Sequence, residues 1–342
     1  MIPAHPLALT ASGRFDERSQ RGLTRYYVDA GAIGVAVGVH TTQFAIRDPK
    51  IGLFRPVLEL AAEVMRERAA DRPFVRIAGV LGPTRQAIAE ARLAAELGYH
   101  VALVSLGGLG SWSDDRLIAH VREIASIIPV MGFYLQPAVG GRLLGYRFWR
   151  RLAGLGDVVA IKIAPFNRYQ TLDVIRGVVD AGALGRIALY TGNDDSIVTD
   201  LVTPFRIRSA SGRLVTARIV GGLLGHWAFW TRRAVELVER CKDPDADLAS
   251  LLALGSTITQ ANAAIFDAAN GYRGCIPGIT EVLRRQGLMR SNRCLDPKEK
   301  LSPGQAREIG RVMKAYGEPG DPSTRLRPTV EAHCSTSRLL DF

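Results

Sequence analysis

Lysine is scarce in this chain, and its scarcity draws attention to one position. Only six of the 44 cationic residues are lysines, at positions 50, 162, 242, 298, 300 and 314. Lys162 lies inside the apolar run of "GDVVAIKIAPFNRY", which is typical of a strand buried on both faces. An ammonium ion is poorly solvated there, and arginine cannot lose its proton. We infer that this position needs a cation that can become neutral.

Cysteine pairs, long apolar runs and basic runs are also lacking. The four cysteines form no CxxC pair and no His/Cys cluster with zinc spacing, so we expect a reduced protein without metal or other cofactor. The first residues, "MIPAHPLALTASGRF", do not resemble a leader, and apolar runs end well short of about 20 residues, so we expect a cytoplasmic protein without a membrane partner.

The net charge of the chain is +11, but the arginines are scattered and not interleaved with aromatics. This pattern indicates a solvated basic surface and no nucleic-acid partner.

Short β-branched runs alternate with segments of helical period, which is typical of βα units and a parallel sheet. The predicted strands are residues 6–10, 33–39, 74–78, 101–105, 130–134, 158–163, 188–191 and 217–222. The predicted helices between them are residues 17–30, 56–69, 85–97, 115–127, 146–153, 169–180, 196–203 and 228–241. This α/β pattern predicts a (β/α)8 TIM barrel over residues 1–241, close to the usual size of about 250 residues. A doubly wound sheet is the alternative, weakened because no GxGxxG opens the first helix.

Beyond residue 241 the strand pattern stops. Helical segments at 246–268, 280–286 and 303–316 predict a C-terminal helical extension over residues 242–316. The remaining residues, 317–342, are rich in proline and polar side chains and are predicted to form a tail at the surface.

Several polar residues are predicted to meet where the barrel strands end, the edge at which barrel enzymes carry their chemistry. Lys162 lies late in the sixth strand, Tyr134 ends the fifth, and the second is followed by His40, Thr41 and Thr42. A desolvated amine forms imines, a phenol moves protons, and a threonine pair holds a carboxylate. Each has a structural alternative, namely a snorkelling or paired lysine, a packed tyrosine and a helix-capping threonine pair. Their convergence on one face favours catalysis.

These residues resemble the dihydrodipicolinate synthase and N-acetylneuraminate lyase superfamily of class I (Schiff-base) aldolases and lyases, over roughly residues 5 to 316. "AIKIAPFN" supplies Lys162 as the imine-forming lysine, and "FYLQPAVGG" supplies Tyr134 as the proton relay. "HTTQF" supplies Thr41 and Thr42 for the carboxylate, and "YTGNDD", with Gly192, resembles the family's Gly-Asp-Asp turn.

The resemblance implies a carbon–carbon or carbon–oxygen lyase that binds pyruvate or another 2-oxo acid as an imine on Lys162. Aldol cleavage, condensation and dehydration share that chemistry, and the second partner would be an aldehyde. The resemblance also implies a homo-oligomer, either a dimer or a tetramer. It leaves open two alternatives: a non-catalytic barrel that binds an anionic ligand or RNA, and a phosphate-handling barrel enzyme, for which "IVGGLLGH" is a faint glycine-rich loop.

The carboxylate motif departs from the family pattern. His40 replaces the glycine before the threonine pair, and Gln43 and Phe44 replace the glycine and glutamate after it. His40 and His226 are titratable residues that the family's pattern does not contain, and they would suit a different substrate. For His226 a structural role is the favoured interpretation.

Two further departures bear on the second substrate. Gly107 and Gly108 occupy the region of the tyrosine that the synthases extend across a dimer interface, so we expect a site complete within one subunit. Val139 aligns with the synthases' arginine, and Arg142 follows three residues later. A second carboxylate would lose water at Val139 without gaining a partner. We therefore expect poor dihydrodipicolinate synthase activity and a less charged aldehyde, aromatic or sugar-derived.

Overall fold

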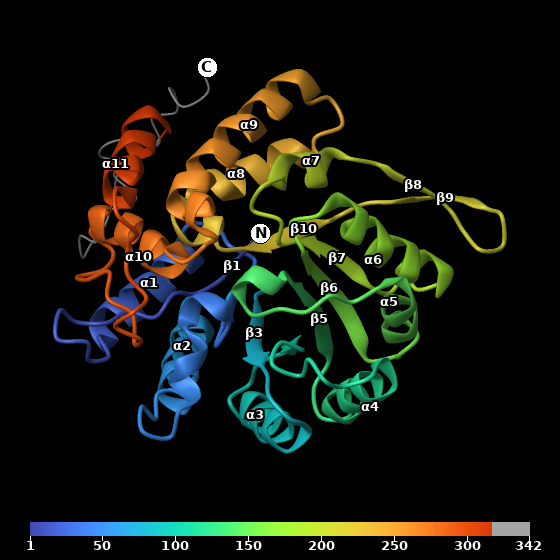
Figure 1. Cartoon of the computed structure of the whole chain (residues 1–342), viewed down its shortest axis with the longest axis horizontal. Helices are drawn as coiled ribbons and strands as arrows, with labels where there is room; N and C mark the ends of the chain where they lie inside the picture. Colours follow the sequence, from blue (N-terminus) through green and yellow to red (C-terminus); the bar gives the residue numbers. More distant parts are fainter. Residues whose placement is uncertain (317–342) are drawn as a thin grey trace.

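A ring of parallel strands forms the centre of the fold (Figure 1) in the computed structural model, which describes residues 1–316. In that range the strands of the main sheet follow the order β1-β10-β7-β6-β5-β4-β3-β2. A parallel bridge between Ala4 and Ala36 then joins the first strand to the second. The strands are β1 (Ile2–Pro3), β2 (Gly34–Val37), β3 (Val75–Val80), β4 (Val101–Ser105), β5 (Val130–Leu135), β6 (Val158–Ala164), β7 (Ala188–Thr191) and β10 (Gly221–Leu224).

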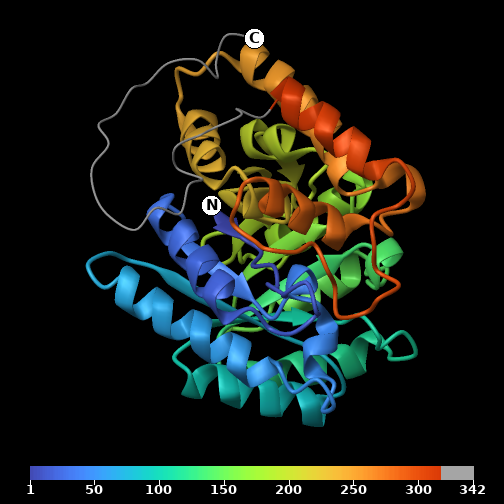
Figure 2. The same cartoon turned by 90° about the vertical axis from the view of Figure 1, so that its left-hand side faces the viewer.

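Helices cover the outside of this ring (Figures 1 and 2). Those that follow the strands are α1 (Glu17–Asp29), α2 (Phe54–Arg68), α3 (Thr84–Glu96), α4 (Asp114–Ala125), α5 (Tyr146–Ala153), α6 (Arg168–Asp180), α7 (Ile197–Val202) and α8 (Thr231–Lys242). The C-terminal helices are α9 (Leu248–Ile265), α10 (Cys275–Arg285) and α11 (Gln305–Tyr316). The predicted TIM barrel with C-terminal helices is confirmed, and the doubly wound alternative is wrong because the sheet closes on itself. The predicted tail, 317–342, lies outside the described residues.

Alternate residues of each strand face either the barrel interior or the helices. On β6, Ala160 and Ala164 belong to the apolar cluster inside the barrel, whereas Ile161 and Ile163 belong to the cluster between the strands and the helices. Lys162 therefore shares the inward face with the two alanines. The same alternation decides the orientation of every side chain at the strand ends.

The first strand lies earlier than predicted. The apolar run at residues 6–10 is buried, but its backbone bonds to the segment that leads into α1 and not to the sheet. The Ala8 N–H donates to the Gln20 side chain, and the Asp16 N–H donates to the Ala8 carbonyl. Burial alone suggested a strand there, whereas sheet hydrogen bonds are what define one.

The segment before the last barrel strand contains a hairpin that was not predicted. Strands β8 (Phe205–Arg208) and β9 (Leu214–Ala217) pair antiparallel and extend away from the ring (Figure 1). The predicted strand at 217–222 is therefore later, at β10. The glycine-rich stretch weighed as a faint phosphate loop lies in this strand, where Gly221 and Gly222 are buried.

The C-terminal helices include one long apolar helix. α9 has a mean hydropathy of 1.3 over its 18 residues, and 22% of it is buried. By length and composition it passes the test for a membrane span, a test that helices of soluble proteins also pass. α9 packs beside α11, so it is part of the helical layer over the barrel (Figures 1 and 2). α10 begins five residues earlier than predicted, at Cys275.

Candidate active site

A pocket opens at the carboxyl ends of the barrel strands. Four of the predicted site residues line it: His40 and Thr41 after β2, Lys162 on β6 and Gly192 after β7. Segments far apart in the sequence thus converge on one cavity, as the barrel topology requires. The other two predicted residues, Tyr134 and Thr42, do not line it.

Lys162 is a buried cation inside the barrel. Its side chain is 8% exposed, and its Nζ lies 4.4 Å from the centre of the Phe133 ring. Burial lowers the pKa of the amine from 10.5 to about 8, and the negative charge of Asp194 acts in the opposite direction. At pH 7 about a tenth of the amine is then neutral, far more than for an ordinary lysine, and the neutral amine is the form that attacks a carbonyl.

Gly192 makes room for the lysine. A Cβ at this position would lie 2.7 Å from Lys162 Cε and 2.7 Å from Ala164 Cβ, closer than real Cβ contacts. The Gly192 N–H also donates to the Ile163 carbonyl at 2.7 Å, so the backbone cannot easily move away. The glycine at the end of β7 is thus explained by close packing against the lysine stem.

Asp194 is the site residue that sequence reasoning missed. It lines the pocket after β7 and accepts hydrogen bonds from the backbone N–H groups of Gly225 and His226, the latter at 3.0 Å. Burial raises the pKa of this carboxyl from 3.8 to about 7, against the attraction of Lys162 and the two N–H groups. The signal was the "NDD" that follows Gly192, which was interpreted as a turn and not as a source of a pocket carboxylate.

The threonine pair divides into two roles. Thr41 lines the pocket, and its buried Oγ1 has no hydrogen-bond partner among the described residues. Thr42 turns inward, where its Oγ1 donates to the His5 carbonyl at 2.6 Å and accepts from the N–H groups of Gly38 and Val39. The Thr42 hydroxyl, predicted to contact substrate, is thus engaged within the protein. It is saturated by the turn that positions Thr41.

Tyr134, predicted to be the proton relay, packs on the helix-facing side of β5. Its ring packs against Trp149 of α5 at a centroid distance of 5.1 Å, and its oxygen accepts from the Leu144 N–H at 3.3 Å. Phe133 is the residue of β5 that pairs with Lys162 and faces the interior. A step of one residue along a strand reverses the side chain, so the relay assigned to Tyr134 is not supported by this geometry.

The two histidines that were singled out have different surroundings. His40 lines the pocket with its ring 5.8 Å from Phe44, and burial together with the charge of Lys162 lowers its pKa to about 4. His226 is buried, and its Nδ1 lies 2.7 Å from the Asn262 Oδ1. The His226 ring thus has the structural role favoured for it, while its backbone N–H holds Asp194.

The C-terminal extension supplies one wall of the pocket. Tyr272 and Cys275 line the cavity, and the Tyr272 ring packs edge-on against Phe166 at 5.7 Å. The Tyr272 phenol hydrogen-bonds the Gln136 side chain after β5, and burial raises its pKa. Burial also raises the pKa of the Cys275 thiol well above its usual range. Among residues 1–316, no three His, Cys, Asp or Glu side chains are grouped to hold a metal ion.

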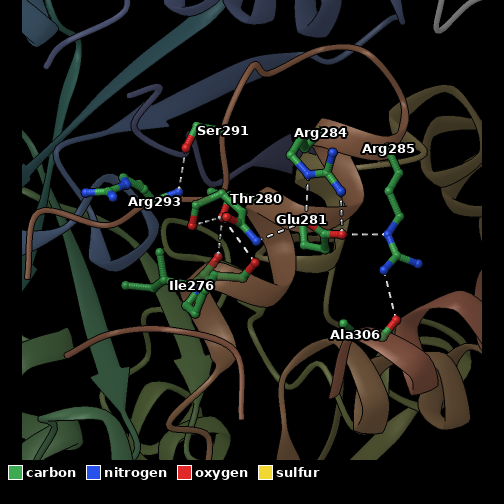
Figure 3. Close-up of polar contacts among 10 residues, drawn as sticks. Ile276, Thr280, Glu281, Arg284, Arg285, Ser291, Arg293 and Ala306 are labelled. Carbon is green, nitrogen blue, oxygen red and sulfur yellow. Dashed lines mark hydrogen bonds and ion pairs between the residues drawn. The ribbon is translucent and has the colours of Figure 1, made fainter. Parts of the chain in front are cut away.

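A buried carboxylate fixes that wall in place (Figure 3). Glu281 of α10 accepts charged hydrogen bonds from Arg284 and Arg285 at 2.7–2.9 Å, and Arg285 also donates to the Ala306 carbonyl of α11 at 2.8 Å. Such paired and fully bonded charges resist separation, so α10 and α11 hold one another in register. The helix that begins at Cys275 is thus linked to α11 through Arg285 and Ala306.

The curated relatives are synthases. The chain is 29% identical over 165 residues to the 4-hydroxy-tetrahydrodipicolinate synthase of Acaryochloris marina, a match that covers 47% of this chain and 53% of that protein. The enzyme of the same name from Synechococcus elongatus is 27% identical over 226 residues, covering 65% of this chain and 70% of that protein. The chain spans about half the length of the first curated relatives it matches. No family model matches the sequence.

Solved structures share the fold at low sequence identity. The pyruvate complex of YagE, a prophage protein of the dihydrodipicolinic acid synthase family from E. coli K12, has a TM-score of 0.75 at 19% identity and covers 92% of this chain and 97% of that chain. N-acetylneuraminate lyase from Fusobacterium nucleatum has a TM-score of 0.72 at 16% identity, covering 93% and 98%. The chain is thus similar in sequence to these synthases, and it shares its fold with a dihydrodipicolinic acid synthase family protein and with an N-acetylneuraminate lyase.

One part of the pocket wall is apolar. Val139, which the sequence resemblance matches to an arginine of the synthases, lines the cavity. Arg142 does not compensate for it, because its guanidinium donates to the carbonyls of Leu109 and Trp112 in the loop after β4. Both hydrogen bonds direct the charge of Arg142 toward that loop and away from a ligand.

Proposed function

We propose that the chain is a lyase that forms a Schiff base between Lys162 and pyruvate or another 2-oxo acid. The observation that carries the proposal is a desolvated amine inside a TIM barrel, lining a pocket at the ends of the strands. The neutral amine attacks the keto carbon, the carbinolamine loses water, and the resulting imine withdraws electrons from the neighbouring carbon. Cleavage, condensation and dehydration each use that electron sink.

The carboxylate of the 2-oxo acid is proposed to lie against Thr41. A buried hydroxyl without a partner is costly, and an anionic oxygen would accept its hydrogen. Thr42 supports this contact indirectly, since its hydroxyl holds the turn after β2. Gly192 leaves the lysine stem free to reach the keto carbon.

The second partner is proposed to be a weakly charged aldehyde, aromatic or sugar-derived. The pocket lining includes Val139, Phe166 and Phe266, and Arg142 donates to the Leu109 carbonyl. An apolar wall of this kind favours uncharged surface over a second carboxylate. We further propose that the enzyme is a cytoplasmic homo-oligomer, a dimer or a tetramer, because the superfamily resemblance implies closed assemblies.

Reductive trapping tests the imine. The protein is incubated with pyruvate and borohydride, digested, and analysed by mass spectrometry for a reduced adduct on the peptide that contains Lys162. Lys162→Ala and Lys162→Arg should both lose the adduct, because neither side chain offers a neutral amine. Lys298→Arg is the matched control, since it removes an exposed lysine and should leave the adduct unchanged.

Two results would contradict the proposal. An adduct of wild-type yield in Lys162→Arg would place the chemistry on another amine. A wild-type protein that traps none of a broad panel of 2-oxo acids would favour a barrel that binds ligands without reacting with them.

A further inference from the structure

The phenol expected to serve the imine, that of Tyr134, does not point into the barrel. Phe133 pairs with Lys162 in the strand register and faces it, and Tyr134 lies outside the barrel against Trp149. Tyr190 of β7 pairs with Lys162 on its other side and packs inside the barrel, but it does not line the pocket. Imine chemistry nevertheless needs a group that gives a proton to the departing hydroxyl and takes one from the carbon next to the imine. Some other pocket side chain must do this work.

The titratable side chains of the pocket, besides the lysine, are His40, Asp194, Tyr272 and Cys275. The Tyr272 phenol is hydrogen-bonded to the Gln136 side chain, and burial raises the pKa values of both Tyr272 and Cys275, which keeps both groups protonated near neutral pH and unable to accept a proton. The His40 pKa is lowered to about 4, so its ring is neutral near neutral pH and is both a weak acid and a weak base there. Asp194 is the candidate that remains.

The position of Asp194 suits proton transfer. It follows Gly192, the residue against which the lysine stem packs, and its charge and that of Lys162 influence each other directly. The backbone N–H groups of Gly225 and His226 anchor the carboxyl group. These backbone bonds orient the carboxyl group, as a catalytic acid or base requires.

We propose that Asp194 is the proton carrier of this site, in the place of the phenol. The proposal rests on the Schiff-base function proposed above. The Asp194 carboxylic acid gives its proton to the carbinolamine hydroxyl, the carbon–oxygen bond breaks, and water leaves an iminium ion. The Asp194 carboxylate then removes a proton from the carbon next to the iminium group. The electron pair of that carbon–hydrogen bond forms the enamine double bond, and the π electrons of the iminium double bond return to nitrogen.

The protonation behaviour of the pair agrees with this role. Burial raises the Asp194 pKa to about 7 and lowers that of Lys162, so near neutral pH the carboxyl group is present in both its acid and its base form. A group that exists in both forms at the working pH is the most effective general acid and base.

Exchange of the pyruvate methyl hydrogens in D2O isolates this step, because it needs the imine and the proton transfer but no aldehyde. The exchange rate is followed by proton NMR in the wild type and in Asp194→Asn, which retains an oxygen that accepts the backbone N–H groups. We expect Asp194→Asn to slow the exchange about 10²- to 10⁴-fold while borohydride still traps its imine at long incubation. Asp195→Asn is the matched control, since Asp195 is exposed and does not line the pocket, and it should exchange at the wild-type rate.

The outcomes separate the two proposals. Asp194→Asn exchanging within about twofold of the wild type, with the adduct present, would overturn the role of Asp194 and leave the imine intact. Loss of exchange in Tyr272→Phe but not in Asp194→Asn would assign the role to the phenol instead. A wild type that forms no adduct would overturn the Schiff-base function itself. If the Asn variant does not fold, Asp194→Ser gives the same test, because its hydroxyl accepts the backbone hydrogens but is not a carboxylic acid.

Discussion

Replacing Lys162 with methionine should stabilise the fold while it abolishes the imine. The side chain is buried, and desolvation lowers its pKa from 10.5 to about 8. This difference corresponds to about 3 kcal/mol of unfavourable free energy for the ammonium form in the folded protein. Methionine has a similar length and no charge, so it fills the same space without that penalty.

The pH dependence of this gain has a definite sign. Below about pH 8 the lysine is protonated in both the folded and the unfolded chain, so the full penalty is present. Between pH 8 and 10.5 the folded amine is neutral while the unfolded amine still holds its proton, so the penalty fades as the pH rises. Asp194 loses a cationic neighbour in the variant and takes up a proton instead, which limits the cost. We expect Lys162→Met to be more stable by about 1 to 3 kcal/mol at pH 7.

Urea unfolding at pH 7 and at pH 9.5 measures this difference. The stability advantage of Lys162→Met should be clear at pH 7 and smaller at pH 9.5, and borohydride with pyruvate should leave no adduct. Lys298→Met is the control, because an exposed lysine pays no desolvation penalty, and its stability should equal that of the wild type. A Lys162→Met protein that is less stable than the wild type at pH 7 would refute the reasoning, since the ammonium group would then be favourably solvated or paired.

Three further predictions concern the pocket and its supports. Gly192→Ala should slow imine formation at least about tenfold in a trapping time course, because the new Cβ would lie 2.7 Å from the Lys162 Cε. Tyr134→Phe should lower the free energy of unfolding by about 1 kcal/mol and leave turnover within about twofold, since the phenol oxygen serves a backbone N–H outside the barrel. His5 and His226 are buried, and their pKa values are lowered to about 4. Between pH 6.5 and about pH 4 both histidines are therefore protonated in the unfolded chain and neutral in the folded chain. Stability should therefore fall as the pH drops through that window, by about 2 kcal/mol per histidine at pH 5, in a series of urea unfolding curves.

Each of these has a control or a contrary result. Gly185→Ala is the match for Gly192→Ala, because a Cβ at Gly185 meets nothing within 4 Å, and it should not affect trapping. A loss of turnover beyond about tenfold in a folded Tyr134→Phe protein would return the proton relay to Tyr134. His226→Asn should reduce the steepness of the pH dependence, and an unchanged slope would mean that His226 is not neutral in the fold.

Local sequence pattern was sufficient for the architecture. The periods of strands and helices follow from the way their side chains face a core. Strands β4 and β7 were therefore predicted at their observed bounds. The same pattern misplaced β1, because buried apolar residues occur both in strands and in irregular segments. The hairpin of β8 and β9 was missed for a related reason: an insertion outside the barrel does not alter the βα repeat.

The composition and the local pattern by themselves determined the barrel, its helical extension and the unusual burial of Lys162, since each depends on neighbours along the chain. Only the tertiary structure decided which side of β5 faces the lysine. The strands pair with Phe133 beside Lys162, after an irregularity in register between Val130 and Met131. Because a shift of one residue exchanges the two faces of a strand, that pairing placed a phenylalanine in the barrel and Tyr134 outside it. Asp194 is likewise held at the pocket by the backbone N–H groups of Gly225 and His226, which are about 30 residues away in the sequence. A local sequence pattern carries no information about such contacts.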